Sequence, residues 1–164
     1  MKDLFLLDQH SSFPDKFYGV ITGQKGLSAI PIYYYNGEVK TIFGKSEVTR
    51  TIFYTGFIPR TYNNEYAIPT IIITNFDLPL FGEVTLEPLY LVKIALEEST
   101  YDFIIAKLEK EKITIDKDFL KKILLEFFGI PSEAIIIESD YKAKAFLINA
   151  NKNFINKFIV VKRT

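Results

Sequence analysis

Hydrophobic residues in the first half of the chain come in short runs rather than at helical spacing. Such runs lie at 4–7, 17–22, 29–35 and 66–74, separated by serine, proline and glycine. Short apolar runs bounded by these residues are typical of β-strands. One helix is expected here, over 47–55, with Ser46 as its N-cap and Gly56 at its end. The first half is therefore predicted to be rich in strands.

The pair Asn36-Gly37 is the strongest local signal in the chain. It separates two runs, 30–35 and 38–43, that alternate in the manner of strands. Asparagine and glycine tolerate the positive φ angles of a two-residue type I′ turn. Pro31 has no backbone N–H to donate, which places its strand at the edge of a sheet. The sequence thus predicts an edge hairpin with a two-residue turn.

The second half carries helix signals. Residues 99–102 have the pattern of a capping box, and helical spacing follows at Tyr101, Ile104, Ile105 and Leu108. Asp116 is the expected N-cap of a second helix that ends at Gly129 and has Leu120, Ile123, Leu124 and Phe127 on its inner face. Strands are expected at 89–96 and 134–138, and a closing hairpin at 142–149 and 154–162.

Because the helices are grouped rather than alternating with strands, the predicted fold class is α+β. It has a β-rich N-terminal half with an edge hairpin, and two amphipathic helices packed on a mainly antiparallel C-terminal sheet. The length of 164 residues favours a single domain over 1–164. An irregular stretch after residue 74 suggests a boundary between two lobes, 1–82 and 83–164.

Composition excludes several kinds of site. The chain has no cysteine and a single histidine, so thiolate metal sites, disulfides and multi-histidine metal sites within one chain are excluded. It has no G-x-G-x-x-G and no phosphate-binding P-loop lysine, so no cofactor and no metal are predicted. No apolar run is long enough to span a membrane, which predicts a cytoplasmic protein without membrane association. A tryptophan-free composition rich in Ile, Lys, Glu, Tyr and Phe is typical of a thermophile.

One constellation suggests metal-dependent chemistry. Asp15 follows a proline, and Glu38 and Lys40 flank Val39, which on paper matches the pattern of PD-(D/E)xK nucleases. In that chemistry two carboxylates hold a divalent metal, and the lysine helps to activate water. Glu38 directly follows the expected turn, so the sequence favours a simpler interpretation. Glu38 and Lys40 are then solvated residues that discourage pairing at a sheet edge.

Two surfaces suggest binding. Tyr33 and Tyr35 are predicted to share an exposed hairpin face with Glu38 and Lys40, where aromatic side chains could contact a protein or stack on bases. The segment 141–164 has six basic residues and no acidic one. Its Lys142, Lys144 and Lys157 are candidate contacts for nucleic-acid phosphates, the alternative being a solvated face or a partner for the acidic segment 83–111.

Catalytic groups are scarce, whereas an edge strand and exposed aromatic residues are expected. The sequence therefore favours a non-enzymatic protein-interaction module or accessory subunit, of thermophilic or viral type. Its partner would be another protein or a second copy of the chain. A nucleic-acid-binding protein, with or without metal-dependent cleavage by Asp15, Glu38 and Lys40, is the alternative.

Overall fold

A computed structural model of the chain describes residues 2–26, 28–45, 52–96 and 99–159. In chain order its elements are α1 (Lys2–Phe5), β1 (Phe17–Gly23), β2 (Ala29–Tyr33), β3 (Val39–Phe43), β4 (Tyr54–Phe57), β5 (Pro69–Ile73), β6 (Glu83–Ala95), β7 (Thr100–Leu108), α2 (Lys117–Phe128), a 3-10 turn (Ser132–Ala134), β8 (Ile135–Glu138) and α3 (Asp140–Phe158).

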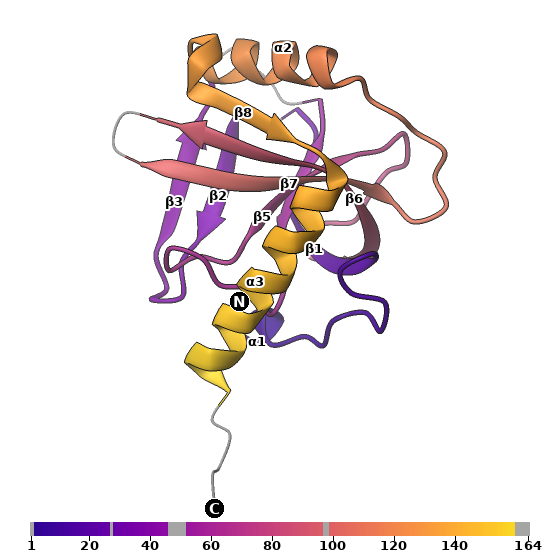
Figure 1. Cartoon of the computed structure of the whole chain (residues 1–164), viewed down its shortest axis with the longest axis vertical. Helices are drawn as coiled ribbons and strands as arrows, with labels where there is room; N and C mark the ends of the chain where they lie inside the picture. The colour runs from indigo at the N-terminus through magenta and orange to yellow at the C-terminus, as the bar shows by residue number, and fades with distance from the viewer. Residues whose placement is uncertain (1, 27, 46–51, 97–98, 160–164) are drawn as a thin grey trace, which may run out of the picture.

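A six-stranded sheet forms the body of the molecule (Figure 1). Its strand order is β1-β4-β5-β7-β6-β8, and β1 also pairs with β6, so that five strands close into a ring. All neighbours in this ring are antiparallel except β5 and β7, which are parallel. The fold class α+β is confirmed.

The interior is filled by large apolar side chains from these strands and from α3. Those that are fully buried include Phe17, Ile21, Phe57, Ile71, Ile72, Phe103 and Phe154. Strands β5 and β7 are buried along most of their length. This continuous apolar character is expected of strands that have neighbours over both faces.

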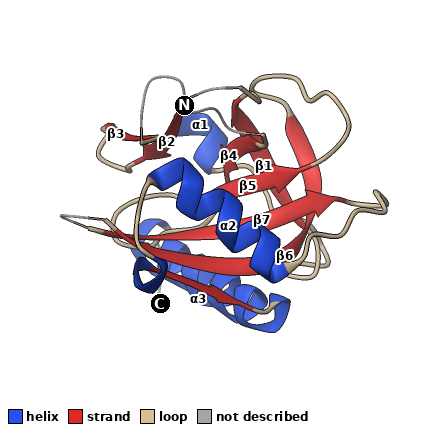
Figure 2. Ribbon diagram, turned by 90° about the horizontal axis from the view of Figure 1, so that it is seen from above, coloured by secondary structure: helices blue, strands red, loops and turns tan. Residues whose placement is uncertain are grey.

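Helix α2 is where the sequence places it. The Asp116 side chain accepts hydrogen bonds from the backbone N–H groups of Asp118 and Phe119. Gly129 ends the helix with a φ of 65°, in the left-handed region that favours glycine. Figures 1 and 2 show α2 across one end of the molecule, beside β8.

The predicted helix after Ser99 is wrong, because this segment is strand β7. Its residues pair with β6 from Thr100 opposite Ala95 to Leu108 opposite Leu86, and with β5 on the other side. Aromatic and β-branched residues such as Tyr101, Phe103 and Ile104 favour a strand, and here two partner strands were available. Pairing with β5 and β6 therefore determined the conformation of this segment, although its apolar residues also have helical spacing.

The predicted closing hairpin is also wrong, because 142–162 lies almost entirely in helix α3 as far as the structure describes it. Ala143, Leu147, Ala150 and Phe154 are buried at helical spacing and form the face that packs along β6. The segment 150–153, expected to be the turn between the two strands, lies within the helix. Ser139 precedes the helix as its N-cap residue.

The remaining elements mostly follow the sequence. Strands are confirmed within 17–22, 66–74, 89–96 and 134–138. The expected strand at 4–7 overlaps helix α1 instead, and the expected helix at 47–55 lies mainly outside the described residues, with β4 beginning at Tyr54. The division into lobes stays a prediction. In the part of the chain that the structure describes, no helix has the length and hydropathy needed to cross a membrane.

The hairpin β2–β3 is confirmed, but its turn has three residues rather than two. Tyr34 donates its backbone N–H to the Glu38 carbonyl, so Tyr35, Asn36 and Gly37 form the loop. Gly37 has a φ of +94°, the left-handed residue that such a loop requires. The additional loop residue shifts the register of β3 by one residue relative to β2. Because side chains alternate between the two faces of a strand, this shift changes which side chains of β2 and β3 share a face. Lys40 lies opposite Ile32, on the face that Tyr34 shares.

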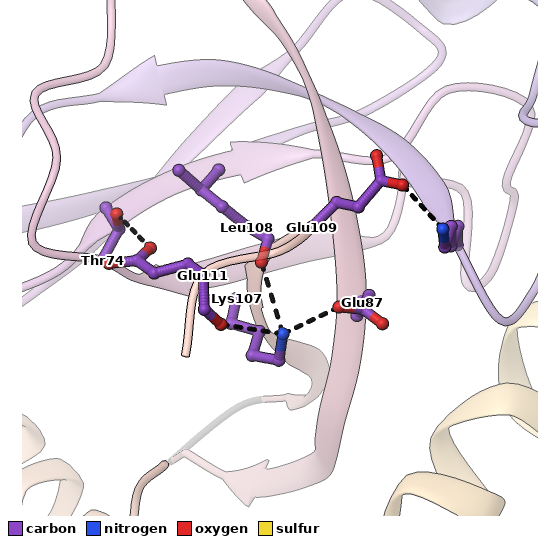
Figure 3. A network of polar contacts seen from close by, with 7 residues as sticks. Thr74, Glu87, Lys107, Leu108, Glu109 and Glu111 are labelled. Carbon is purple, nitrogen blue, oxygen red and sulfur yellow. Dashed lines mark hydrogen bonds and ion pairs between the residues drawn. The ribbon is translucent and has the colours of Figure 1, made fainter. Parts of the chain in front are cut away.

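A polar network fixes the segment that follows β7 (Figure 3). The Lys107 ammonium donates to Glu87 Oε1 at 2.7 Å and to the Glu111 carbonyl at 3.0 Å. The Glu111 carboxylate in turn accepts a hydrogen bond from the Thr74 hydroxyl at 2.6 Å. This network links β5, β6 and the segment leading to α2, and we assign it a structural role.

Candidate functional site

A cleft of about 620 Å³ lies between the hairpin and one end of the closed sheet. We call it the tyrosine cleft, and its lining residues are Tyr34, Lys40, Asn64, Glu65, Tyr66, Leu96, Ser99, Thr100 and Tyr101. They come from the hairpin, from the turn before β5 and from the residues that flank the β6–β7 connection. Three segments far apart in the sequence therefore form one site.

The turn before β5 presents Glu65 to the cleft. Asn63 and Tyr66 exchange two backbone hydrogen bonds of 3.0 Å, and Asn64 and Glu65 between them have φ angles of 49° and 72°. Two positive φ angles are the signature of a type I′ turn. Glutamate seldom adopts this conformation, and such backbone strain is concentrated at functional sites. The Tyr35 N–H holds the turn by donating to the Glu65 carbonyl at 2.9 Å.

Three tyrosine rings form the wall of the cleft. Tyr66 lies between the other two, with ring centroids 5.6 Å from Tyr34 and 6.1 Å from Tyr101. The Lys40 ammonium is 5.1 Å from the centroid of the Tyr34 ring, within the range of a cation–π interaction. Among the described residues no ion pair holds Lys40. Its charge is available to an anionic ligand.

The hydroxyls of Tyr34 and Tyr66 are held in their protonated form. Burial, with smaller contributions from the nearby Tyr101, Tyr66 and Glu38, raises the pKa of Tyr34 to about 12. Burial also raises the pKa of Tyr66 to about 12. Both hydroxyls therefore keep their protons at neutral pH, and a protonated hydroxyl can donate a hydrogen bond to an anion.

A second hollow of about 840 Å³ continues from the cleft. The two share Lys40, Leu96, Ser99 and Tyr101. We call the second hollow the apolar groove. The residues that line only this groove are Thr41, Ile42, Phe43, Ala95, Phe128, Gly129, Ile130, Pro131 and Ala134. One continuous depression thus has a polar end and an apolar end.

The described residues do not fit a resident metal centre. Across 2–26, 28–45, 52–96 and 99–159, no three Asp, Glu or His side chains are grouped so that they could hold an ion. Glu65 is the single carboxylate among the residues that line the cleft. Asp102 lies next to this wall, but it accepts a hydrogen bond from Asn63 at 3.1 Å, and its pKa is raised, chiefly by burial.

The three residues of the nuclease pattern have different surroundings. Asp15 forms an ion pair of 3.1 Å with Lys144 on α3. Glu38 follows the hairpin turn, where its backbone N–H donates to Asn36 Oδ1. Of the three, only Lys40 lines the tyrosine cleft. The structure does not gather Asp15, Glu38 and Lys40 into one set of ligands.

The predicted exposed face of the hairpin is wrong for Tyr33 and Tyr35. Both side chains are partly buried. Tyr33 packs against Phe57, and Tyr35 stacks on Phe158 with ring centroids 4.6 Å apart. The three-residue loop also places Lys40 and Tyr34, rather than Tyr33, on one face. That Tyr33 and Tyr35 contact a partner stays a prediction.

The basic residues near the C-terminus lie on a helix, not on a hairpin. Lys142, Lys144 and Lys157 belong to α3. Lys144 is engaged by Asp15 at 3.1 Å and lies 4.0 Å from Asp140. Lys142 and Lys157 are exposed. A binding role for these lysines stays a prediction.

The sequence itself matches no protein-family model and no curated protein. The fold, however, is shared with solved inorganic pyrophosphatases. The enzyme from Thermus thermophilus has a TM-score of 0.69 at 13% identity, covering 92% of this chain and 98% of that one. The enzyme from Neisseria gonorrhoeae has a TM-score of 0.68 at 12% identity, covering 87% and 92%. The enzyme from Helicobacter pylori has a TM-score of 0.66 at 15% identity, covering 90% and 98%.

Identities this low establish the fold alone. A fold shared with enzymes over most of the chain nevertheless contradicts the prediction of a non-enzymatic interaction module or accessory subunit. It equally contradicts the nucleic-acid-binding alternative and the expectation that the chain is not an enzyme. Those predictions rested on the scarcity of catalytic motifs, and a site gathered from separate segments need not contain one.

Sequence reasoning missed most of the cleft. Glu65, Ser99 and Tyr101 were not recognised as functional candidates, because each lies in a segment without a functional motif. A weak signal was present in Asn63-Asn64, since asparagine tolerates positive φ and suggests a turn before the strand. Lys40 was singled out, chiefly as part of a metal site with Asp15 and Glu38.

Proposed function

We propose that the chain is pyrophosphatase-like and acts on a compound that carries a diphosphate group, bound in the tyrosine cleft. The observation that carries this proposal is the likeness of the fold to inorganic pyrophosphatases over about nine-tenths of the chain. The cleft supports it, because it combines an available ammonium with hydroxyl donors. A cytoplasmic location, as predicted from the sequence, is part of the proposal.

The chemistry proposed is hydrolysis of the phosphoanhydride. A water oxygen forms a bond to one phosphorus, the bridging P–O bond breaks, and each product keeps one phosphate. Lys40 would stabilise charge on the phosphate oxygens, and the Tyr34 and Tyr101 hydroxyls would donate hydrogen bonds to them. Glu65 is the carboxylate in the described lining that can accept the proton of the attacking water. Magnesium would enter with the diphosphate as part of the substrate.

Replacing Lys40 by glutamine is expected to weaken the affinity for pyrophosphate about tenfold to a hundredfold, because a hydrogen bond from a charged donor is lost. Binding is measured by titration calorimetry, and phosphate release is measured with magnesium present. Lys122→Gln is the matched control, since Lys122 is exposed on α2 and does not line the cleft. Absence of both binding and phosphate release in the wild type would refute the proposal. So would equal affinities of the two variants.

We further propose that the partner predicted from the sequence is a second copy, which associates through the outer face of α3. Tyr141, Ala145, Ile148, Lys152, Ile155 and Ile159 are exposed and alternate at spacings of four and three. This is the spacing of a coiled-coil seam. In an antiparallel pair, Tyr141 would meet Ile159, Ala145 would meet Ile155, and the stem of Lys152 would cover Ile148. In these pairs the smaller Ile159 and Ala145 lie opposite the larger Tyr141 and Ile155, and the flexible Lys152 lies opposite Ile148.

This association has a distinctive salt dependence. The helix carries Lys142, Lys144, Lys152 and Lys157 but a single acid, Asp140, so two copies repel each other. Added salt screens that repulsion, and we expect dimerisation to strengthen as salt is raised. Analytical ultracentrifugation of the wild type and of Ile148→Glu measures it. A monomeric wild type at high salt, or a dimer that Ile148→Glu leaves intact, would contradict it.

A further inference from the structure

We propose that the diphosphate compound carries a hydrocarbon chain, which lies in the apolar groove while its phosphates occupy the tyrosine cleft. The inference rests on the proposed function and specifies its substrate class. A pyrophosphate ion is wholly polar and fits the polar cleft without touching the groove. The groove, with about 840 Å³, is larger than the cleft and would remain unused.

Most of the side chains that line the groove alone are apolar. Phe43 on β3 is 70% exposed at its rim, and Phe128, Ile130 and Pro131 line it from the end of α2 and the segment that follows. A contiguous patch of exposed apolar side chains marks a binding site or an interface. Covering the groove with hydrocarbon would remove apolar surface from water, which favours binding.

The two ends are joined at a distance that suits one ligand. Lys40 and Ile42 lie two residues apart on β3, so their side chains share one face of the strand, about 7 Å apart. Ser99 and Tyr101 line both hollows at the junction. A chain attached to a phosphate that contacts Lys40 would therefore pass Ile42 before it reaches Phe43 at the rim of the groove.

The lining favours hydrocarbon over a nucleoside. Among the described residues that line the groove alone, Thr41 is the single polar side chain. A nucleobase and its sugar carry several donors and acceptors that need partners, and unsatisfied polar groups reduce affinity. A hydrocarbon chain makes no such demand.

The test compares three ligands by titration calorimetry, namely geranyl diphosphate, pyrophosphate and ADP, each with magnesium. Each buried methylene improves affinity about fourfold. Two or more buried methylenes give geranyl diphosphate at least about a tenfold tighter dissociation constant than pyrophosphate. Phe43→Ser should reduce this ratio several-fold. Phe76→Ser is the matched control, because Phe76 is 59% exposed and lines neither hollow.

The outcomes separate this inference from the proposed function. Equal affinities for geranyl diphosphate and pyrophosphate, both weakened by Lys40→Gln, would overturn the inference and leave the proposed function intact. Tighter binding of ADP than of geranyl diphosphate would also overturn the inference. The inference would also be overturned if Phe43→Ser left the ratio of the affinities for geranyl diphosphate and pyrophosphate unchanged. If Lys40→Gln weakens neither ligand, the proposed function itself fails.

Discussion

Replacing Gly56 by alanine is expected to lower the free energy of unfolding by about 3 kcal/mol or more, because β4 can no longer approach β1. A Cβ atom added at Gly56 would lie 2.2 Å from the Val20 carbonyl oxygen and 3.0 Å from its carbonyl carbon. Both are backbone atoms of the neighbouring strand, so no rotamer change relieves the clash. Gly56 lies opposite Ile21 in the ladder that helps to close the five-stranded ring.

Urea unfolding of the two proteins measures this difference. Gly19→Ala is the control, since the added Cβ would lie 2.7 Å from Leu86 Cδ1, the far end of a flexible side chain. Leu86 can move by a small rotation, so we expect a cost of about 1 kcal/mol there. A Gly56→Ala protein no less stable than Gly19→Ala would show that the β1–β4 approach is not as close as described.

The sequence predicted α2 well because its signals are local. Asp116 at its start and Gly129 at its end act on backbone groups within a few residues, so no knowledge of the tertiary structure is needed. The β2–β3 hairpin was predicted for the same reason. Its register was not, since both loop lengths are compatible with Asn36-Gly37, and the chosen loop decides the face of Lys40.

Strand β7 and helix α3 could not be assigned from local signals. The segment 100–108 has apolar residues at both strand and helix spacing, and its pairing with β5 and β6 decided the outcome. In α3, the stripe of Ala143, Leu147, Ala150 and Phe154 was present in the sequence, but the weakly apolar alanines concealed it.

The tyrosine cleft was beyond prediction for a topological reason. Lys40, Glu65 and Ser99 are brought together only when β4, β5, β6 and β7 assemble beside the hairpin. No spacing rule links them. The type I′ conformation of Asn64 and Glu65 also depends on the hydrogen bond from Tyr35, a contact made by the hairpin.

The last expected result concerns alkaline pH and Tyr66. This side chain is 1% exposed, and burial raises its pKa from 10.0 to about 12. Between about pH 10 and about pH 12, the unfolded chain has released the Tyr66 proton while the folded chain still holds it, so the free energy of unfolding falls as the pH rises. The full loss from a shift of this size is about 2–3 kcal/mol, and it is absent below about pH 9.

Tyr66→Phe removes this contribution and therefore flattens the pH dependence. The variant is expected to be about 1 kcal/mol less stable at neutral pH, because the Tyr66 hydroxyl accepts a hydrogen bond from the Asp102 N–H at 3.2 Å. Its stability curve should cross that of the wild type near pH 11. The free energy of unfolding of the variant still falls as the pH rises, since burial also raises the pKa of Tyr34 and Tyr35.

Urea unfolding from about pH 8 to about pH 11 measures both curves, with Tyr141→Phe, a change at an exposed tyrosine, as the control. Parallel curves for the wild type and Tyr66→Phe would show that Tyr66 ionises as readily in the folded chain as in the unfolded one.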